Sequence, residues 1–169
     1  DLFWDINGAT AGAGGTAPAG TWNATNTLFN SVAGGTGATQ AWVAGSNAFF
    51  SAGSDATGTF TVTVSGTQDV GNITFEEGTV TLTGGTLNIA GGTITNAGTA
   101  TINSALAGSA GLTKLGTGQL NLGGNSTYTG VTNVNEGSIA VTRNSALGAG
   151  GTEADGTNIA AGARLQLSG

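Results

Sequence analysis

Between Gly111 and Val141, the sequence alternates apolar residues with small polar ones in short bursts, and glycine or asparagine ends each burst. Apolar residues at every second position, over a short run bounded by turn residues, are typical of half-buried strands. The bursts follow one another too closely for helical crossovers to fit between them. This pattern therefore predicts an all-β fold in which short strands are joined by tight turns.

One spacing recurs along the chain. It separates Ile73 from Ile94, Ile94 from Leu115, and Leu120 from Val141. A period of about 20 residues, as here, is a sign of repeat architecture. Because successive turns of a β-helix lie about 4.8 Å apart, we expect about seven or eight turns and a rod roughly 35 Å long.

The three tryptophans follow a similar spacing. Trp4, Trp22 and Trp42 succeed one another at nearly the same interval, and one more interval reaches Val62. We expect the rings to stack inside the rod, one per turn, and to plug its first turns, because aromatic side chains gain much from burial and the end of a solenoid needs a cover. The alternative is an exposed platform on which sugars stack, which makes these three residues weak candidates for a binding site.

The stretch from residue 111 to 141 resembles the passenger-associated, or autotransporter-associated, β-strand repeat of bacterial type V secreted proteins. The positions that carry this repeat motif are Leu112, Lys114, Gly116, Gly118, Leu120, Leu122, Tyr128, Gly130, Val134, Gly137, Ile139 and Val141. The resemblance implies a right-handed parallel β-helix that is exported and exposed at the bacterial cell surface. It implies no particular activity, since one architecture can carry unrelated functions.

We expect a single β-solenoid domain over residues 1–169. Its expected parts are irregular, tryptophan-containing first turns (1–56), regular turns that include the repeat motif (57–144), and a last turn (145–169) that begins with a loop (148–156). The strands that we expect in the regular and last turns, outside the motif, are 59–65, 79–83, 86–90, 92–95, 99–103, 158–161 and 164–168. Glycine pairs at 84–85 and 91–92 are expected at corners, where a positive φ suits glycine best.

Composition excludes several classes of function. The chain has neither cysteine nor histidine, so disulfides, thiol chemistry, a Ser-His-Asp triad and histidine-ligated zinc are ruled out. A net charge of −6 with three basic residues argues against binding nucleic acid. No apolar run approaches the length of a membrane span. Neither a signal peptide nor barrel strands are recognisable, so we expect either a fragment or a protein that works without a translocator.

Two local patterns need comparison with known chemistry. Glu76 and Glu77 form an adjacent acidic pair with Asp69 nearby, which could suggest sugar hydrolysis or a cation site. Neighbours on a strand point to opposite faces, so we expect Glu76 to face solvent and Glu77 to lie at the turn. The segment 12–17 fits a loose dinucleotide-binding spacing, but Pro18 follows where a helix should run. We therefore expect no enzyme, no metal site and no cofactor.

Two functions remain. The first is a structural or adhesive extracellular module of an autotransporter-like surface protein, with a glycan or a protein of the host or its matrix as ligand. The second is a subunit that stacks end to end into a filament or surface layer, because an uncapped β-helix ends in unpaired backbone groups. An enzyme acting on polysaccharides would need a polar cluster on adjacent turns, which the sequence does not show.

Overall fold

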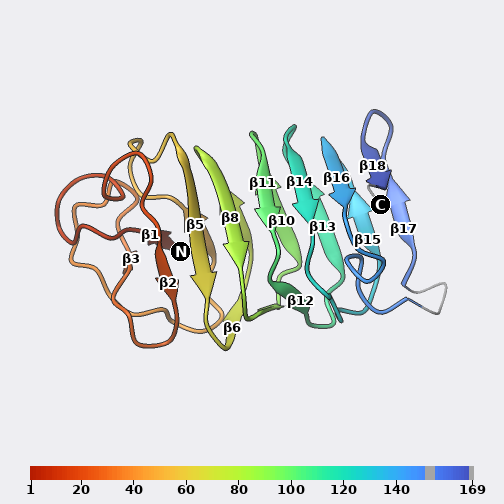
Figure 1. Cartoon of the computed structure of the whole chain (residues 1–169), viewed down its shortest axis with the longest axis horizontal. Helices are drawn as coiled ribbons and strands as arrows, with labels where there is room; N and C mark the ends of the chain where they lie inside the picture. Colours follow the sequence, from red (N-terminus) through yellow and green to blue (C-terminus); the bar gives the residue numbers. More distant parts are fainter. Residues whose placement is uncertain (151–154, 168–169) are drawn as a thin grey trace.

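A computed structural model describes residues 1–150 and 155–167 and shows three β-sheets that run along one elongated body, here called the rod (Figure 1). Sheet A has the strand order β17-β15-β13-β10-β7-β4-β1-β3. Its strands in chain order are β1 (Leu2–Trp4), β3 (Phe29–Asn30), β4 (Ala48–Phe50), β7 (Ile73–Phe75), β10 (Thr93–Asn96), β13 (Leu112–Leu115), β15 (Thr132–Val134) and β17 (Thr157–Ile159).

Sheets B and C complete the walls of the rod. Sheet B contains β2 (Gly20–Trp22), β5 (Thr59–Val64), β8 (Thr79–Thr83), β11 (Ala100–Ile102), β14 (Gln119–Leu122), β16 (Ser138–Val141) and β18 (Arg164–Leu167). Sheet C contains β6 (Thr67–Val70), β9 (Thr86–Ile89) and β12 (Ala105–Ala107). From β4 to β12 the chain visits the three sheets in turn, and it then alternates between sheets A and B. This is the course expected of a parallel β-solenoid, and the predicted all-β class is confirmed.

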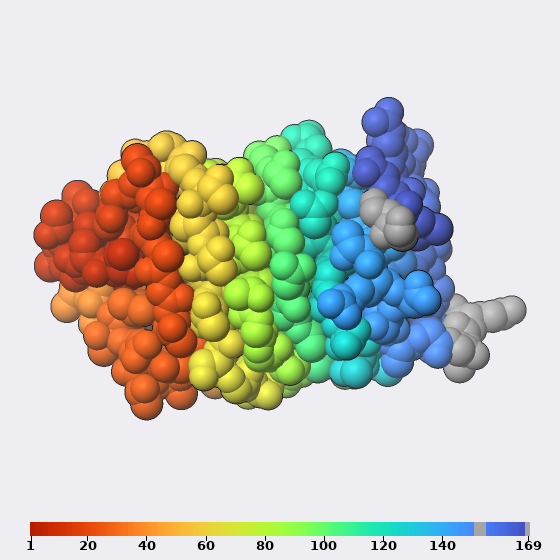
Figure 2. Space-filling view, viewed as in Figure 1, coloured from red at the N-terminus to blue at the C-terminus, as the bar shows by residue number. Residues whose placement is uncertain are grey.

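Sequence order follows the long axis of the rod, so that the colours in Figure 2 form successive bands from the N-terminal to the C-terminal end. All the strand pairs of the three sheets are parallel except one, because β1 pairs with β3 in the antiparallel direction. Parallel neighbours require the chain to return to the same end of the sheet before each new strand. The repeated circuit around the rod supplies that return.

Register explains the recurring spacing. Ile73 pairs with Ile94, as the spacing predicts. The spacing from Ile94 to Leu115 differs from the register by one position, because the partner of Ile94 is Lys114. The spacing from Leu120 to Val141 differs from it by two positions, since Leu120 pairs with Ile139. In both cases the chain completes the circuit slightly earlier than expected, and the alternation of side chains decides which residue then faces the core.

The tryptophan spacing does not correspond to the register of the ladder. Trp22 pairs with Val64 and Leu2 pairs with Ala48, so each of these partners lies about two periods further along the chain. The expected link from Trp42 to Val62 is therefore wrong. The first circuit is about twice as long as the later ones because it contains β3 and two long loops.

The core is a column of aliphatic side chains between the sheets. Along β5, exposed and buried residues alternate strictly, and β8 alternates between half-buried and buried residues. The buried residues of sheet B lie in register from strand to strand, as Val62, Leu82, Ile102, Leu122 and Val141. Burial of each such side chain contributes about 1.5–3 kcal/mol. In a protein without disulfides, this column and the backbone ladder hold the rod together.

Strand 79–83 is confirmed as predicted, and most other expected strands lie within one or two positions of the observed bounds. Outside the named strands, Gln40 forms an isolated antiparallel bridge with Phe29. The loop expected over 148–156 lies partly outside the described residues, and so does Ser168 in the last expected strand.

Candidate functional site

The repeat motif occupies the four strands β13 to β16, which form two successive steps of sheets A and B. Its apolar positions point into the core: Leu112, Leu120, Leu122, Tyr128, Val134, Ile139 and Val141 are all buried. The motif is therefore a unit of packing. Its spacing puts apolar residues of one step over those of the step below.

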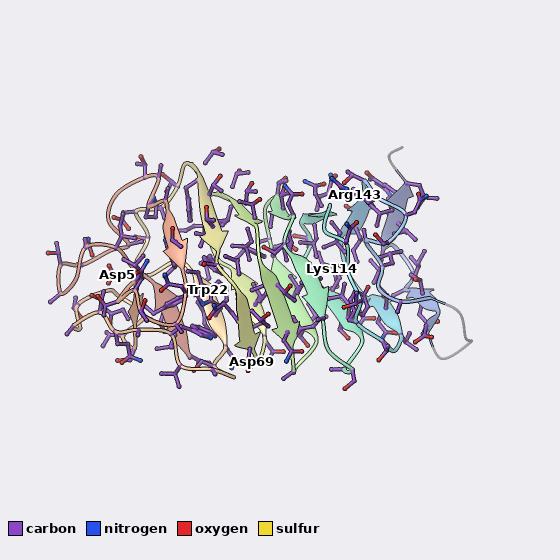
Figure 3. The ribbon with its side chains drawn as sticks, turned by 60° about the horizontal axis from the view of Figure 1, so that its bottom comes forward. Asp5, Trp22, Asp69, Lys114 and Arg143 are labelled. Carbon is purple, nitrogen blue, oxygen red and sulfur yellow. The ribbon has the colours of Figure 1, made fainter. Side chains whose placement is uncertain are left out.

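A lysine lies inside this apolar column. Lys114 has no exposed surface, and its Nζ donates to the backbone oxygens of Leu115 at 2.7 Å and Gly116 at 2.6 Å. Figure 3 shows the residue within the body of the rod. Burial lowers the pKa of Lys114 to about 8, and the nearby charge of Glu136 opposes this change. A carboxylate oxygen of Glu136 accepts from the N–H of Gly116 at 2.8 Å, so the same turn is held from both sides.

At Tyr128, the third wall of the rod continues beyond sheet C without a further strand. Sheet C ends at β12, and beyond it the N–H groups of Thr127 and Tyr128 both donate to the carbonyl of Leu106. The Tyr128 hydroxyl forms a hydrogen bond of 2.8 Å with Thr132 Oγ1, in which either oxygen is the donor. Burial raises the pKa of Tyr128 to about 12, while the bond to Thr132 acts in the opposite direction.

Gly137 makes the corner between β15 and β16. Its φ of +63° lies in the left-handed region, where a side chain is unfavourable. A Cβ at this position would collide with the backbone oxygens of Gly118 and Gly116 on the preceding step. This glycine therefore permits the two steps to stack closely at their corner.

The three tryptophans are buried together near the N-terminal end of the rod. Trp22 and Trp42 meet edge to face, with 4.7 Å between their ring centroids, and both contact Phe29. Trp4 also contacts Phe29, at 5.3 Å. The expectation of one tryptophan per turn is wrong, because these residues form one cluster around Phe29. With all three indoles buried, they offer no exposed platform for a sugar.

The acidic pair has the orientation expected from the strand pattern. Phe75 is buried, Glu76 is exposed and Glu77 lies at the following turn. Partial burial of the Glu76 carboxyl group and the nearby charge of Glu77 together raise the pKa of Glu76. Glu77 accepts a hydrogen bond from Ser51 Oγ at 3.1 Å. Asp69 lies apart on sheet C, where Asn88 donates to it, so the structure does not assemble the three acids into one site.

The glycine-rich segment 12–17 holds a carboxylate of the same chain. The N–H groups of Ala13 and Gly15 donate to the two oxygens of Asp55 at 2.6 and 2.7 Å. Burial acts to raise the pKa of Asp55, but these bonds outweigh it and the pKa is lowered. The loop thus forms an anion-binding turn whose anion is internal.

An array of threonines covers the outward side of sheet B. Thr61, Thr81 and Thr101 lie opposite one another on β5, β8 and β11, and Asn121 of β14 extends the row. Parallel to it, further rows are Thr21, Thr63 and Thr83, and Thr59 with Thr79. None of the strands from β2 to β16 in sheet B contains a charged residue.

Sequence reasoning missed two of these features. The burial of Lys114 could have been found, because strict alternation from Leu112 points Lys114 inward. The binding of Asp55 to the 12–15 loop could not, since 40 residues separate the partners Gly15 and Asp55. Among the described residues, the structure contains no group of three or more acidic residues placed to hold a metal ion.

The fold and the motif define a class: a parallel β-solenoid with a passenger repeat in its C-terminal half. The family model of the passenger-associated-transport-repeat matches residues 112–141. The chain is also 38% identical, over 172 residues, to the adhesin BmaC autotransporter of Brucella suis biovar 1 (strain 1330). The alignment covers all of this chain and 5% of that protein. No solved structure matches the chain.

The chain therefore carries a passenger-associated-transport repeat over residues 112–141 and resembles, over its whole length, a segment of an autotransporter adhesin. It is accordingly an exported segment located at the outside of the bacterial cell. In the part that the structure describes, no helix has the length and apolarity that crossing a membrane requires.

Proposed function

We propose that this chain is a structural and adhesive module of an exported passenger, built as a single domain and a right-handed β-helix of about seven or eight turns. The seven strands of sheet B support this number of turns. The relative from Brucella is named an adhesin, which supports an adhesive role. The module binds without catalysis, in agreement with a chain that contains no histidine and that, over the described residues, does not bring three acidic residues together.

The outward threonine rows of sheet B are the observation that carries this function. Neighbouring strands lie about 4.8 Å apart, and alternate residues on a strand lie about 6.7 Å apart, so the hydroxyls form a regular array. Each hydroxyl can both donate and accept a hydrogen bond. An uncharged array of this kind suits a glycan or an uncharged protein surface better than an ionic ligand. With a net charge of −6, we expect no binding to nucleic acid.

The experiment compares two matched double variants in binding to arrayed glycans and to immobilised fibronectin and collagen. Thr61→Lys with Thr81→Lys changes one outward pair of sheet B, which lies in register. Thr74→Lys with Thr95→Lys changes an equivalent pair of sheet A. We expect the first variant to bind a ligand of the wild type at least about tenfold more weakly, and the second to retain it. Equal loss in both variants would contradict the assignment to sheet B.

The C-terminal end of the rod favours self-assembly as a second candidate. Within the described residues, the last strands, β17 and β18, each pair on one side only. Two large apolar side chains there are exposed, Ile159 to 49% and Leu167 to 79%. Unpaired strand edges invite pairing with another chain. Light scattering over a concentration series, with electron microscopy, tests this candidate; a constant monomer mass without fibres would contradict it.

A further inference from the structure

The two ends of the rod differ in how their edges are covered. At the C-terminal end of the described chain, β17 and β18 present one unpaired side each. At the N-terminal end, β1 pairs with β4 on one side and with β3 on the other. The N-terminal edge of sheet A is therefore already occupied, and the strand that occupies it runs in the opposite direction to the rest of the ladder.

Strand β3 is held next to β1 by a buried hydrogen-bonded pair, Asp5 and Asn30. The side-chain amide of Asn30 donates to the carboxylate of Asp5 at 2.8 Å and to the backbone oxygen of Gly37 at 2.6 Å. The side-chain oxygen of Asn30 accepts from the N–H of Val32 at 2.9 Å. Asp5 and Asn30 are both fully buried. Since buried polar groups are costly when unpaired, these contacts strongly favour the position of β3 next to β1.

Sheet B is protected at the same end by a side chain. Trp22 directs its carbonyl toward the neighbouring strand, where Ser65 N–H donates to it at 2.9 Å. The preceding carbonyl, that of Thr21, accepts from the side-chain amide of Asn26 at 3.1 Å. Asn26 thus satisfies a backbone group that a further strand would otherwise bind.

Three loops and the aromatic cluster complete the cover. The N–H of Gly12 donates to the carbonyl oxygen of Gly34 at 3.0 Å, and the N–H of Gly53 donates to that of Ala33 at 2.6 Å, so the loop after β3 is bonded both to the loop between β1 and β2 and to the loop after β4. The cluster around Phe29 fills the interior of the rod at this end. Figure 1 shows these loops gathered at the N-terminal end.

We propose that residues 1–56 are a terminator of the β-ladder, which closes the N-terminal end of the rod against pairing with any other strand. A second copy of the chain is then unable to continue sheet A across this end. This inference is independent of which ligand the outward surface binds.

The test removes β3 and its adjoining loops from the terminator while preserving the circuit. Residues 23–47 are replaced by a copy of residues 65–72, which connect the same two sheets one step further along. The ends match, because Trp22 pairs with Val64 and Ala48 pairs with Ile73. The replacement is made in a background that carries Ile159→Lys and Leu167→Lys, since charged residues on an edge strand oppose pairing at the C-terminal end.

In this background, we expect the full chain to keep a constant monomer mass in light scattering. The replacement variant should retain a β-type circular dichroism spectrum while its weight-average mass at least about doubles with concentration. Phe3→Lys on the opened edge of β1 should restore the monomer. A folded, monomeric replacement variant would overturn the proposal. So would complete unfolding, because residues 1–56 would then be part of a core that cannot be separated from the rod.

A second variant leaves the aromatic cluster in place. Asn30→Ala removes the hydrogen bond between Asn30 of β3 and Asp5 after β1, without shortening the chain. We expect faster amide exchange at Asp5, whose N–H donates to Leu28, together with a smaller rise in mass than in the replacement variant. Unchanged exchange and unchanged mass would show that the pair does not hold the cover, and would count against the proposal.

Discussion

The ammonium group of Lys114 lies 2.6 Å from the carbonyl oxygen of Gly116, inside the apolar column of the rod. A buried charge is unfavourable unless hydrogen bonds compensate it, and here the turn after β13 supplies two carbonyls. The N–H of the same glycine donates to Glu136 on the next step. The turn at Gly116 therefore connects the motif lysine of one step with the acidic side chain of the next.

Replacement of Lys114 should reveal how much its hydrogen bonds and its packing each contribute to stability. Lys114→Ala removes two hydrogen bonds and leaves a cavity, so we expect a loss of about 2–4 kcal/mol in the free energy of unfolding. Lys114→Met keeps most of the volume and avoids burying a charge, so its loss should be smaller. Urea unfolding followed by circular dichroism measures both. A larger loss in Met than in Ala would contradict this account.

Stability should rise with pH above neutrality. The pKa of Lys114 is about 8 in the folded chain and 10.5 in the unfolded chain, so the unfolded chain binds more protons between these values. The free energy of unfolding should then increase by about 1–2 kcal/mol from pH 8 to pH 10. Lys114→Met should abolish this increase. A wild-type stability that falls over this range would exclude the assigned pKa.

At higher pH, the dependence of stability on pH should reverse. Tyr128 has a pKa of about 12 when folded and 10.0 when unfolded. The folded chain therefore holds the proton that the unfolded chain loses, and stability should fall as the pH rises through 10 to 12. In Tyr128→Phe this fall should be weaker. Denaturant titrations of wild type and variant at several pH values provide the measurement.

Glycine substitutions should separate the stability cost of backbone strain from the cost of a steric collision. Gly66 and Gly137 both have a positive φ, but a Cβ meets nothing within 4 Å at Gly66 and meets backbone oxygens at Gly137. Gly66→Ala should cost about 1 kcal/mol from conformation alone. Gly137→Ala should cost clearly more. Equal melting temperatures for the two variants would argue that the steps are not closely stacked at this corner.

Trp4 and Trp22 provide a matched pair of positions for substitution by phenylalanine. The indole N–H of Trp4 donates to the oxygen of Pro18 at 2.7 Å, whereas that of Trp22 is buried without a partner. Phenylalanine in place of Trp4 leaves that oxygen unpaired, so this variant should be less stable than Trp22→Phe by about 1 kcal/mol. Thermal unfolding of both variants tests the difference. A more stable Trp4→Phe would contradict it.

The regular half of the rod could be predicted from local pattern. Alternation along Thr79–Thr83 specified the strand and its inward face, and the distance from Ile73 to Ile94 agrees with the pairing of β7 and β10. The corner glycines Gly84 and Gly92, both with positive φ, were also predictable. These features were accessible because each step contacts mainly the next, so that one short period in the sequence contains most of the information.

The first circuit could not be derived in this way. Trp22 and Val64 are partners although about two periods of the repeat lie between them, and Asp5 finds Asn30 across a loop that no period describes. The burial of the tryptophans in one cluster depended on Phe29, around which all three gather. Contacts between distant segments without a repeat carry no local signature, so pattern alone left this end of the rod undetermined.

Sequence alone determined the all-β class, the period of the steps and the family of the repeat, because side-chain alternation and turn residues act over short distances. Tertiary structure decided two further matters: the antiparallel cover of β1 by β3 and the alignment of the threonine rows on sheet B. Both depend on the register between strands. A shift of one position reverses which side chains face the core, and only the packed rod selects that register.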